Sequence, residues 1–406
     1  MNAVIKKSRA FGEIFAPTSK SMAHRLLIAA AMAEGTSVIH RVTPSADVLA
    51  TVNCLKALGA KIETNGSDYT VIGCDMRKSC PTCALNANES GSTLRFLIPI
   101  AALCGAEVSF VGAPRLMQRP LEVYENLFAE RGMSFEKDID MLSVIGPIEP
   151  GTFSVRGDVS SQFISGLLFA LPILESDSII RILPPLESKS YIELTLIALR
   201  QFGINAYFED GLTIRISGNQ KYTSGSFFVE GDYSGAAFPD ALNLFGSDVR
   251  VLGLDENSAQ GDKIYKEIYP KLTVASPEID ISNCPDLAPI LFTVAAYFNG
   301  ATFLGTSRLK IKESDRAEVM ATELRKFGAD ITVLENSVII KKAELHAPIQ
   351  MLCGHNDHRV VMSLAVLLTA FGGEIEGAEA VSKSYPDFFE DIKAIGIEVT
   401  LRDTVN

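Results

Sequence analysis

The sequence predicts an α/β (α+β) fold of two similar domains, each built from three repeated βαβαββ units. Two observations support this prediction. A segment that ends a helix, passes through a glycine and enters a strand occurs five times. Helices that are apolar on almost every side also recur, at a spacing of roughly 70 residues. Six such units account for nearly the whole chain of 406 residues.

The recurring segment is a helix C-terminus, first seen as LKALGAKIE at residues 55–63. Glycine adopts the left-handed conformation without steric cost, so it ends the helix and reverses the chain into a strand. The glycines are Gly59, Gly132, Gly203, Gly328 and Gly396. Hairpin signals such as Asn65-Gly66 and Asp210-Gly211 then predict a second short strand.

Two helices precede each glycine, an apolar one and then an amphipathic one. A helix that is hydrophobic on every side has to be surrounded by protein. Each unit therefore contributes one interior helix, one outer helix and a small sheet. The interior helices begin near Ser19, Glu89, Ser160, Asp232, Asp286 and Asp357. The fourth unit is shorter and lacks the glycine.

Three units can close around their interior helices, so six units give two domains. We expect one domain at residues 13–229 and a discontinuous second domain at residues 1–12 and 230–406. The chain then crosses between domains near residues 13–16 and 228–231, and two crossings make a hinge.

The discontinuity follows from the sixth unit. It ends at residues 397–401 without its second strand. We therefore expect residues 3–5 to return and complete its sheet.

The composition excludes several classes of protein. Hydrophobic residues make up 47% of the chain and charged residues 21%, and no apolar run is long enough to span a bilayer. The formal net charge of −12 would repel nucleic acid and anionic membranes. Because the first residues contain no apolar signal region, we expect a cytoplasmic protein with reduced cysteines.

No metal site is expected. Cys80 and Cys83 form one C-x-x-C pair with Cys74 nearby, but no second pair or histidine follows at ligand spacing. The five histidines are scattered along the chain. An anion would have to be bound by Lys and Arg side chains.

The starts of the interior helices predict such an anion site. They read PTSKSMAHR, ESGSTLR, VSSQF, GDYSG, CPDLA and NDHR. A helix N-terminus carries free N–H groups and partial positive charge, so extra cations there are unfavourable unless an anion arrives. The candidate ligands are Lys20, Ser21, Arg25, Arg95 and Arg359. We expect these ends to converge on one or two small polyanions; the alternative is that each hydroxyl is only a helix cap.

The stretch KIKESDR at residues 310–316 has two interpretations. Asp315 can cap the helix that follows, with the other charges facing solvent. Alternatively, the stretch brings working charges to the anion site, namely Lys312, Glu313 and Arg316. A carboxylate among cations there could serve acid–base chemistry. Asp286 is a second candidate carboxylate, and a helix cap is its alternative role.

Seven short motifs occur in order along the chain. They are P-x-S-K-S-x-x-x-R at 17–25, S-G-S-T-L-R at 90–95, P-R-x-x-x-R-P at 114–120, S-S-Q-F at 160–163, K-E-S-D-R at 312–316, N-D-H-R at 356–359 and K-S-Y-P-D at 383–387. Each motif alone is weak, but seven in order are specific. From residue 17 to 389 the chain resembles the 5-enolpyruvylshikimate-3-phosphate synthases.

This resemblance implies the inside-out barrel of the enolpyruvyl transferases, with two domains of three repeats. It implies transfer of the enolpyruvyl group of phosphoenolpyruvate to the 5-hydroxyl of shikimate 3-phosphate, with release of phosphate, in the shikimate pathway to chorismate and aromatic amino acids. No cofactor or metal is implied, since a C–O bond breaks and fixed Lys and Arg supply positive charge. We expect a monomer that closes on its substrates.

The resemblance also assigns roles to residues. Those implied for shikimate 3-phosphate are Lys20, Ser21, Arg25, Ser160, Ser161, Gln162, Ser188, Tyr191, Asp286, Arg308 and Lys312. Those implied for phosphoenolpyruvate are Lys20, Gly91, Arg115, Gln162, Arg316, Arg359 and Lys383. Asp286 would take the proton of the attacking hydroxyl, Glu313 would protonate the methylene carbon, and Lys20 is the third catalytic candidate. The domain at 13–229 would bind mainly shikimate 3-phosphate, and the other mainly phosphoenolpyruvate.

Some positions depart from the family pattern. Arg308 stands where Asn can contact the shikimate phosphate side, which leaves its role open. Glu89 stands where Asn is common, and Ser92 and Phe96 also differ from the common pattern of that helix.

Two other functions stay open. UDP-N-acetylglucosamine enolpyruvyl transferases share the architecture but typically carry a reactive cysteine in the loop matching residues 112–120, which here reads GAPRLMQRP. A non-catalytic binder of phosphorylated metabolites would need the cations but not Asp286 and Glu313. A nucleotide-dependent kinase is disfavoured, because the sequence has neither a P-loop motif nor a G-x-G-x-x-G fingerprint.

Overall fold

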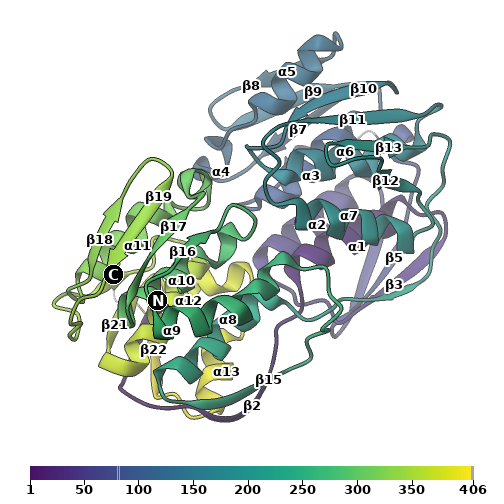
Figure 1. The fold of residues 1–406 in the computed structure, drawn as a ribbon. Coiled ribbons are helices and arrows are strands. Elements are labelled where there is room, and N and C mark those ends of the chain that lie inside the picture. The colour runs from purple at the N-terminus through teal and green to yellow at the C-terminus, as the bar shows by residue number, and fades with distance from the viewer. Residues whose placement is uncertain (80, 82, 404–406) are drawn as a thin grey trace. The chain divides into compact units, whose positions relative to one another are not determined.

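The computed structural model describes residues 1–79, 81 and 83–403, so Cys80 of the C-x-x-C pair lies outside the described residues. The chain divides into two compact units (Figure 1). The continuous unit contains residues 20–230, and the split unit contains residues 1–19 and 231–406. The chain therefore passes between the units twice, after Ser19 and after Glu230.

The first crossing lies seven residues later than the expected boundary at residues 12 and 13. Strand β2 (Phe11–Phe15) pairs in parallel with β15 (Asp248–Leu252), so it belongs to the split unit. Only one of its five residues is buried, and Phe11 and Phe15 are exposed. The strand therefore has no alternating apolar face by which the sequence could reveal its partner.

Each described repeat contains one interior helix, as predicted. These helices are α1 (Lys20–Met32), α3 (Gly91–Ala101), α6 (Ser161–Ala170), α8 (Tyr233–Leu242), α10 (Ala288–Tyr297) and α12 (His358–Phe371). The starts of α3, α6, α8 and α12 are capped by short polar side chains that accept a hydrogen bond from a free backbone N–H group. The caps with this bond are Ser90, Ser160, Asp232 and Asp357.

The outer helices follow the interior ones along the chain. They are α2 (Ala46–Ala57), α5 (Glu122–Glu130), α7 (Lys189–Gln201), α9 (Tyr265–Val274), α11 (Arg316–Arg325) and α13 (Phe388–Ala394). The five predicted capping glycines all have positive φ, between 66° at Gly132 and 107° at Gly396. The predicted helix ends are therefore confirmed.

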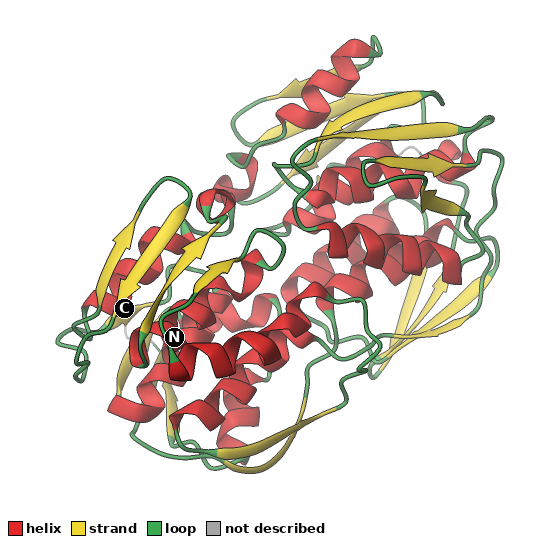
Figure 2. Cartoon of the chain, viewed as in Figure 1, coloured by secondary structure: helices red, strands yellow, loops and turns green. Residues whose placement is uncertain are grey.

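The strands form small mixed sheets at the periphery of each unit (Figure 2). In the continuous unit, one sheet has the strand order β14 (Ser226–Phe228), β3 (Thr36–His40), β5 (Asp68–Ile72) and β4 (Lys61–Asn65). A second has the order β6 (Leu85–Asn86), β7 (Glu107–Val111), β9 (Met141–Ile145) and β8 (Ser134–Lys137). A third has the order β10 (Thr152–Arg156), β11 (Ser178–Leu183), β13 (Thr213–Ile216) and β12 (Ala206–Phe208). In the split unit, one sheet has the strand order β16 (Glu278–Asp280), β17 (Gly300–Leu304), β19 (Ser337–Lys341) and β18 (Asp330–Val333). A second has the order β20 (Leu352–Cys353), β21 (Gly373–Glu376), β1 (Asn2–Ile5) and β22 (Val399–Arg402). Strands β15 and β2 form a two-stranded sheet.

Two sheets are completed by strands distant in sequence. β1 lies between β21 and β22, with Ala3 opposite Ile375 and Leu401, so the predicted return of the N-terminal strand is confirmed. β14 pairs in parallel with β3, so the end of the third repeat completes the sheet of the first. The sequence analysis did not predict this second closure.

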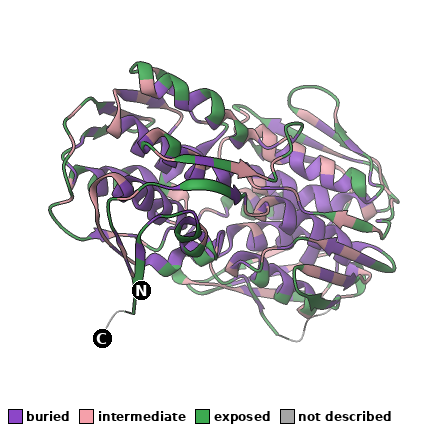
Figure 3. Ribbon diagram, turned by 90° about the horizontal axis from the view of Figure 1, so that it is seen from below, coloured by how far each residue is buried: buried purple, intermediate pink, exposed green. Residues whose placement is uncertain are grey.

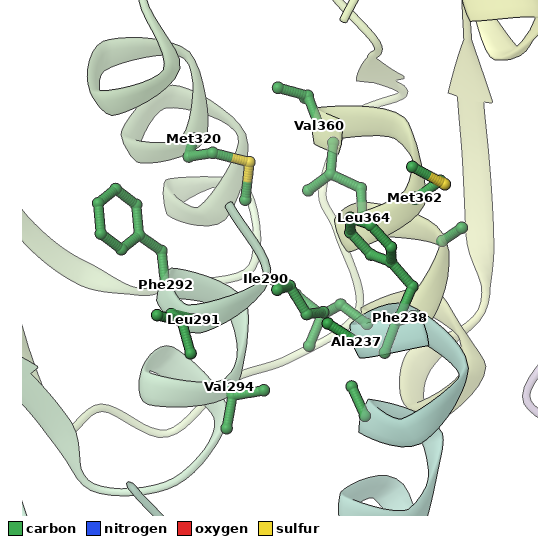
Figure 4. Packing of buried hydrophobic residues seen from close by; sticks show 14 of the residues in the cluster. Ala237, Phe238, Ile290, Leu291, Phe292, Val294, Met320, Val360, Met362 and Leu364 are labelled. Carbon is green, nitrogen blue, oxygen red and sulfur yellow. The ribbon is translucent and has the colours of Figure 1, made fainter. Parts of the chain in front are cut away.

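The core of each unit is built around its interior helices. Residues 358–369 of α12 are all buried, and buried segments fill the interior in Figure 3. In the split unit, Phe238 of α8, Ile290 of α10 and Leu364 of α12 belong to one cluster with Met320 of α11 (Figure 4). None of the helices in the described part of the chain is long and apolar enough to cross a bilayer.

We predict that Ile5→Ala destabilises the split unit, because Ile5 is 1% exposed and its strand is central in its sheet. Loss of a buried Ile side chain costs about 2–5 kcal/mol of the free energy of unfolding. Urea unfolding would measure the loss. The matched control, Lys7→Ala, removes an exposed side chain and should change the midpoint little. Equal midpoints for both variants would contradict a structural role for β1.

Candidate active site

In the split unit, the Asp315 cap predicted within KIKESDR is confirmed, but the expectation that the other charges face solvent is wrong for Lys312, Glu313 and Arg316. The Asp315 side chain caps α11 by accepting a hydrogen bond from the Glu318 backbone at 3.3 Å. The next residue, Arg316, turns inward and is only 1% exposed. The short sequence therefore both starts a helix and delivers a buried cation.

Arg316 is held by carboxylates from three elements. Its Nη1 lies 2.8 Å from Asp286, its Nη2 lies 2.8 Å from Glu313, and its Nε lies 2.9 Å from Asp357. Burial lowers the pKa of this guanidinium, but the three carboxylates outweigh burial and raise it above its usual value. Asp357, in turn, is fully buried, and Arg316 holds its pKa below the usual value despite that burial.

Asp286 lies among three cations. It is part of the 3-10 turn η5 (Pro285–Leu287) that precedes α10, and it accepts hydrogen bonds from Lys312 at 3.1 Å, Arg316 at 2.8 Å and Arg359 at 3.2 Å. Burial raises the pKa of Asp286, but the charges of Arg359, Lys312 and Arg316 prevail and hold it well below its usual value. Its alternative role as a helix cap is wrong, because the residue capping α10 is Leu287, without a side-chain bond.

Arg359 connects the starts of the three interior helices of the split unit. It lies at the second position of α12, and its Nη1 donates to Ser234 Oγ of α8 at 2.6 Å and to the Asp286 carbonyl before α10 at 3.1 Å. Within this unit the predicted convergence of helix starts is confirmed. Lys383, at the end of η7 (Ala378–Lys383), reaches the same region by donating to the Asn356 carbonyl.

Lys312 and Arg308 come from the segment before α11. Burial lowers the pKa of Lys312, with Asp286 acting in the opposite direction. Arg308, in η6 (Ser307–Ile311), donates to the Ser282 carbonyl at 2.6 Å and is buried. The guanidinium that replaces the common Asn is thus partly engaged by the protein's own backbone.

In the continuous unit, Arg25 ties α1 to α7. Its guanidinium donates to Thr195 Oγ1 at 2.8 Å, to the Ser21 carbonyl at 2.6 Å and to the Tyr191 carbonyl at 2.8 Å. It also lies over the Phe96 ring at 5.1 Å. Burial lowers the pKa of Arg25 to about 10, which still leaves it charged at neutral pH.

The starts of the other two interior helices of this unit meet through Gln162 on α6. Gln162 accepts from Arg95 of α3 at 2.8 Å and donates to Ser92 of α3 at 3.0 Å. Ser160 caps the same helix, and the neighbouring Ser161 is buried. The polar side chains predicted from S-G-S-T-L-R and S-S-Q-F therefore do lie together.

Lys20 has a partner that the sequence analysis missed. Its Nζ lies 2.7 Å from Asp47 Oδ2 on α2, and both side chains are largely buried. Ser188, the residue before α7, is also buried and has a left-handed backbone with φ of 55°. Such a conformation is uncommon for serine and persists where surrounding structure fixes it.

The two arginines of P-R-x-x-x-R-P differ in burial. Arg115 lies on the short helix α4 (Pro114–Met117) and is exposed. Arg119, four residues later, is buried, and a Cβ built on Gly91 would lie 2.6 Å from its Nη1. The Arg119 guanidinium therefore occupies the space beside the start of α3, and a larger residue at position 91 would displace it. Both arginines occur in P-R-x-x-x-R-P, and spacing alone did not distinguish them.

Among the described residues, no group of three His, Cys, Asp or Glu side chains could hold a metal ion.

Comparison with known proteins identifies the family. The model for EPSP synthase (3-phosphoshikimate 1-carboxyvinyltransferase) matches residues 4–392. The chain belongs to the EPSP synthase family. The 3-phosphoshikimate 1-carboxyvinyltransferase of Clostridium novyi (strain NT) is 41% identical over 426 residues, covering 97% of each chain. A relative of the same name from Clostridium perfringens is 40% identical over 420 residues, 97% of this chain and 98% of the relative.

Solved structures share the fold of this EPSP synthase family member. EPSP synthase from Acinetobacter baumannii has a TM-score of 0.78 at 25% identity, covering 98% of this chain and 99% of that one. The enolpyruvyl transferase NikO from Streptomyces tendae has a TM-score of 0.77 at 14% identity, covering 98% of both chains, and supports the fold alone. The predicted enolpyruvyl transferase fold is confirmed.

The activity follows from the family match and the curated relatives. It is 3-phosphoshikimate 1-carboxyvinyl transfer, a step of the shikimate pathway in aromatic amino acid biosynthesis. The predicted family and reaction are confirmed, and the interpretation as a non-catalytic binder is not needed.

We predict that Arg119→Ala lowers kcat/KM of the transferase by about 10²–10³-fold, as expected when a buried donor to a reacting anion is lost. The matched control is Arg115→Ala, which removes an exposed guanidinium from the same loop and should change kcat/KM by less than about threefold. Steady-state phosphate release would compare the two variants. A large loss of kcat/KM for Arg115→Ala alone would support Arg115, and not Arg119, as the phosphoenolpyruvate ligand.

We predict that Asp357→Asn lowers the free energy of unfolding at pH 7 by about 3–5 kcal/mol, because it breaks a buried ion pair with Arg316. The folded-state pKa of Asp357 is depressed, so its contribution is present above the usual carboxylate pKa. It is lost as the pH falls through the folded-state pKa. Urea unfolding of wild type and variant should therefore differ at pH 7 and converge in acid, whereas the exposed control Asp330→Asn should differ little throughout.

Proposed function

We propose that Asp286 and Glu313 transfer the protons in this reaction, in which the enolpyruvyl group of phosphoenolpyruvate passes to the 5-hydroxyl of shikimate 3-phosphate and phosphate leaves. The observation that carries the proposal is the arrangement around Arg316. One buried guanidinium contacts both carboxylates at 2.8 Å, which fixes the two candidate proton carriers relative to each other. Fixed geometry is the first requirement of general acid–base catalysis.

Asp286 is proposed as the group that takes the hydroxyl proton. Before substrates bind, its low pKa makes it a weak base. Anionic substrates that pair with Arg359 and Lys312 would compete for the cations that depress this pKa. The pKa of Asp286 would then rise toward the range in which it can accept a proton.

Glu313 is proposed as the group that protonates the methylene carbon of phosphoenolpyruvate. Its side chain is about one-fifth exposed, whereas Arg316 behind it is buried. Glu313 can therefore contact a substrate while its ion pair with Arg316 stays inside the protein.

The cations are proposed as substrate ligands. For phosphoenolpyruvate they are Lys20, Arg119 in place of Arg115, Arg316, Arg359 and Lys383, together with Gly91 and Gln162. Every nitrogen of the Arg316 guanidinium already contacts a carboxylate. An anion that pairs with Arg316 would compete with these carboxylates, which couples ligand binding to the freeing of Asp286 or Glu313.

The polar groups at the starts of α1, α6 and α7 are proposed to bind shikimate 3-phosphate. Hydroxyls and free N–H groups at helix starts suit a phosphate group. The residues are Lys20, Ser21, Arg25, Ser160, Ser161, Gln162, Ser188 and Tyr191, with Arg308, Lys312 and Asp286 from the split unit. We further propose that the enzyme acts as a cytoplasmic monomer.

A phosphate-release assay tests this function. Wild type should release phosphate from phosphoenolpyruvate with shikimate 3-phosphate as acceptor and not with UDP-N-acetylglucosamine. Asp286→Ala and Glu313→Gln should each lower kcat by about 10²–10⁴-fold, the usual contribution of a positioned acid or base. Full turnover by both variants would contradict the proton-transfer roles, and turnover with the uridine acceptor would contradict the substrate assignment.

A further inference from the structure

Glu323 is a buried carboxylate that the reaction does not use directly. It lies on α11 seven residues after Arg316, which is two helical turns, so both side chains lie on one face of the helix. It is 1% exposed and accepts hydrogen bonds from three groups: Nε2 of His355 at 2.9 Å, Nζ of Lys326 at 2.8 Å and the backbone N–H of Cys353 at 2.9 Å.

Two of these three partners belong to the turn at residues 353–356, which joins β20 to α12. His355 and Asn356 in this turn have left-handed backbones, with φ of 48° and 52°. Left-handed residues other than glycine are uncommon and persist where the surroundings fix them. The hydrogen bonds that Glu323 accepts from the His355 ring and the Cys353 backbone N–H supply that constraint.

This turn leads directly into ligands proposed for phosphoenolpyruvate. Arg359 lies three residues after Asn356, and Lys383 donates to the Asn356 carbonyl. α11 therefore holds the segment at two points, because Arg316 binds Asp357 at its end and Glu323 binds Cys353 and His355 at its beginning.

We infer that Glu323 is a positioning residue for phosphoenolpyruvate: it holds the turn at 353–356 in the conformation that sets the places of Arg359 and Lys383. The inference rests on the phosphoenolpyruvate ligands proposed above. Glu323 acts through the turn and contacts no substrate itself.

A carboxylate suits this role better than an amide. Its two oxygens accept from a histidine ring, an ammonium and a backbone N–H at the same time. A glutamine has one acceptor oxygen, and its NH₂ group would point toward N–H donors in place of the second oxygen, so those hydrogen bonds would be lost. The hydrogen bonds from His355 and Lys326 also hold the pKa of Glu323 below its usual value, although burial acts to raise it, so the side chain is ionised at neutral pH.

The first test is the steady-state kinetics of Glu323→Gln. We expect KM for phosphoenolpyruvate to rise about tenfold or more, as when a charged hydrogen bond is lost, while KM for shikimate 3-phosphate changes less than about twofold. A purely structural loss would reduce the active fraction and lower kcat without a rise confined to one substrate. Glu318→Gln is the matched control, since it makes the same change at an exposed position of the same helix.

A second pair of variants keeps the test informative if Glu323→Gln folds poorly. His355→Gly and His355→Ala both remove the ring contact, but glycine accepts the left-handed backbone and alanine resists it. We expect KM for phosphoenolpyruvate to be about fivefold higher for the alanine variant than for the glycine variant. If all three variants keep the wild-type KM for phosphoenolpyruvate, the inference is wrong. If wild type itself releases no phosphate, the proposed function fails instead.

Discussion

Six helices in the described part of the chain are apolar on almost every side, and the need to surround them with protein determines most of the structure. No single sheet or helix can cover such a surface, so each repeat adds an outer helix and a small sheet at the periphery. Interior helices packed side by side also begin near one another. In the split unit this brings Ser234, Asp286 and Arg359 into direct contact. A packing requirement thus gathers helix N-termini, which favour anions.

The same packing makes the Lys and Arg side chains at these helix starts energetically unfavourable until a negatively charged group pairs with them. In the structure the protein's own carboxylates meet this need, most clearly Asp286, Glu313 and Asp357 around Arg316. A buried guanidinium without such partners would be strongly unfavourable. The carboxylates that stabilise the site before substrates arrive are also the groups proposed to move protons, so substrate binding and acid–base chemistry depend on the same contacts.

Much of this could be predicted from the sequence because the signals are local. Gly59 and Gly396 mark helix ends by their conformational freedom, and the missing last strand of the sixth repeat pointed to β1. The pairing of β2 with β15 gave no signal, since only one of the five residues of β2 is buried. Arg119 was missed because its motif contains two arginines and only three-dimensional packing buries one of them. Glu323 gave no signal in the sequence, because its partners Cys353 and His355 lie 30 and 32 residues away.

The central place of β1 has a consequence for biosynthesis. In this sequence β1 (Asn2–Ile5) is synthesised long before its neighbours β21 (Gly373–Glu376) and β22 (Val399–Arg402). Residues 20–230 can fold while synthesis continues, but the sheet of the last repeat cannot form until residues 399–402 have emerged. Strand β1 must therefore stay unpaired until those residues have been made, and in that time it is exposed to aggregation and to chaperones.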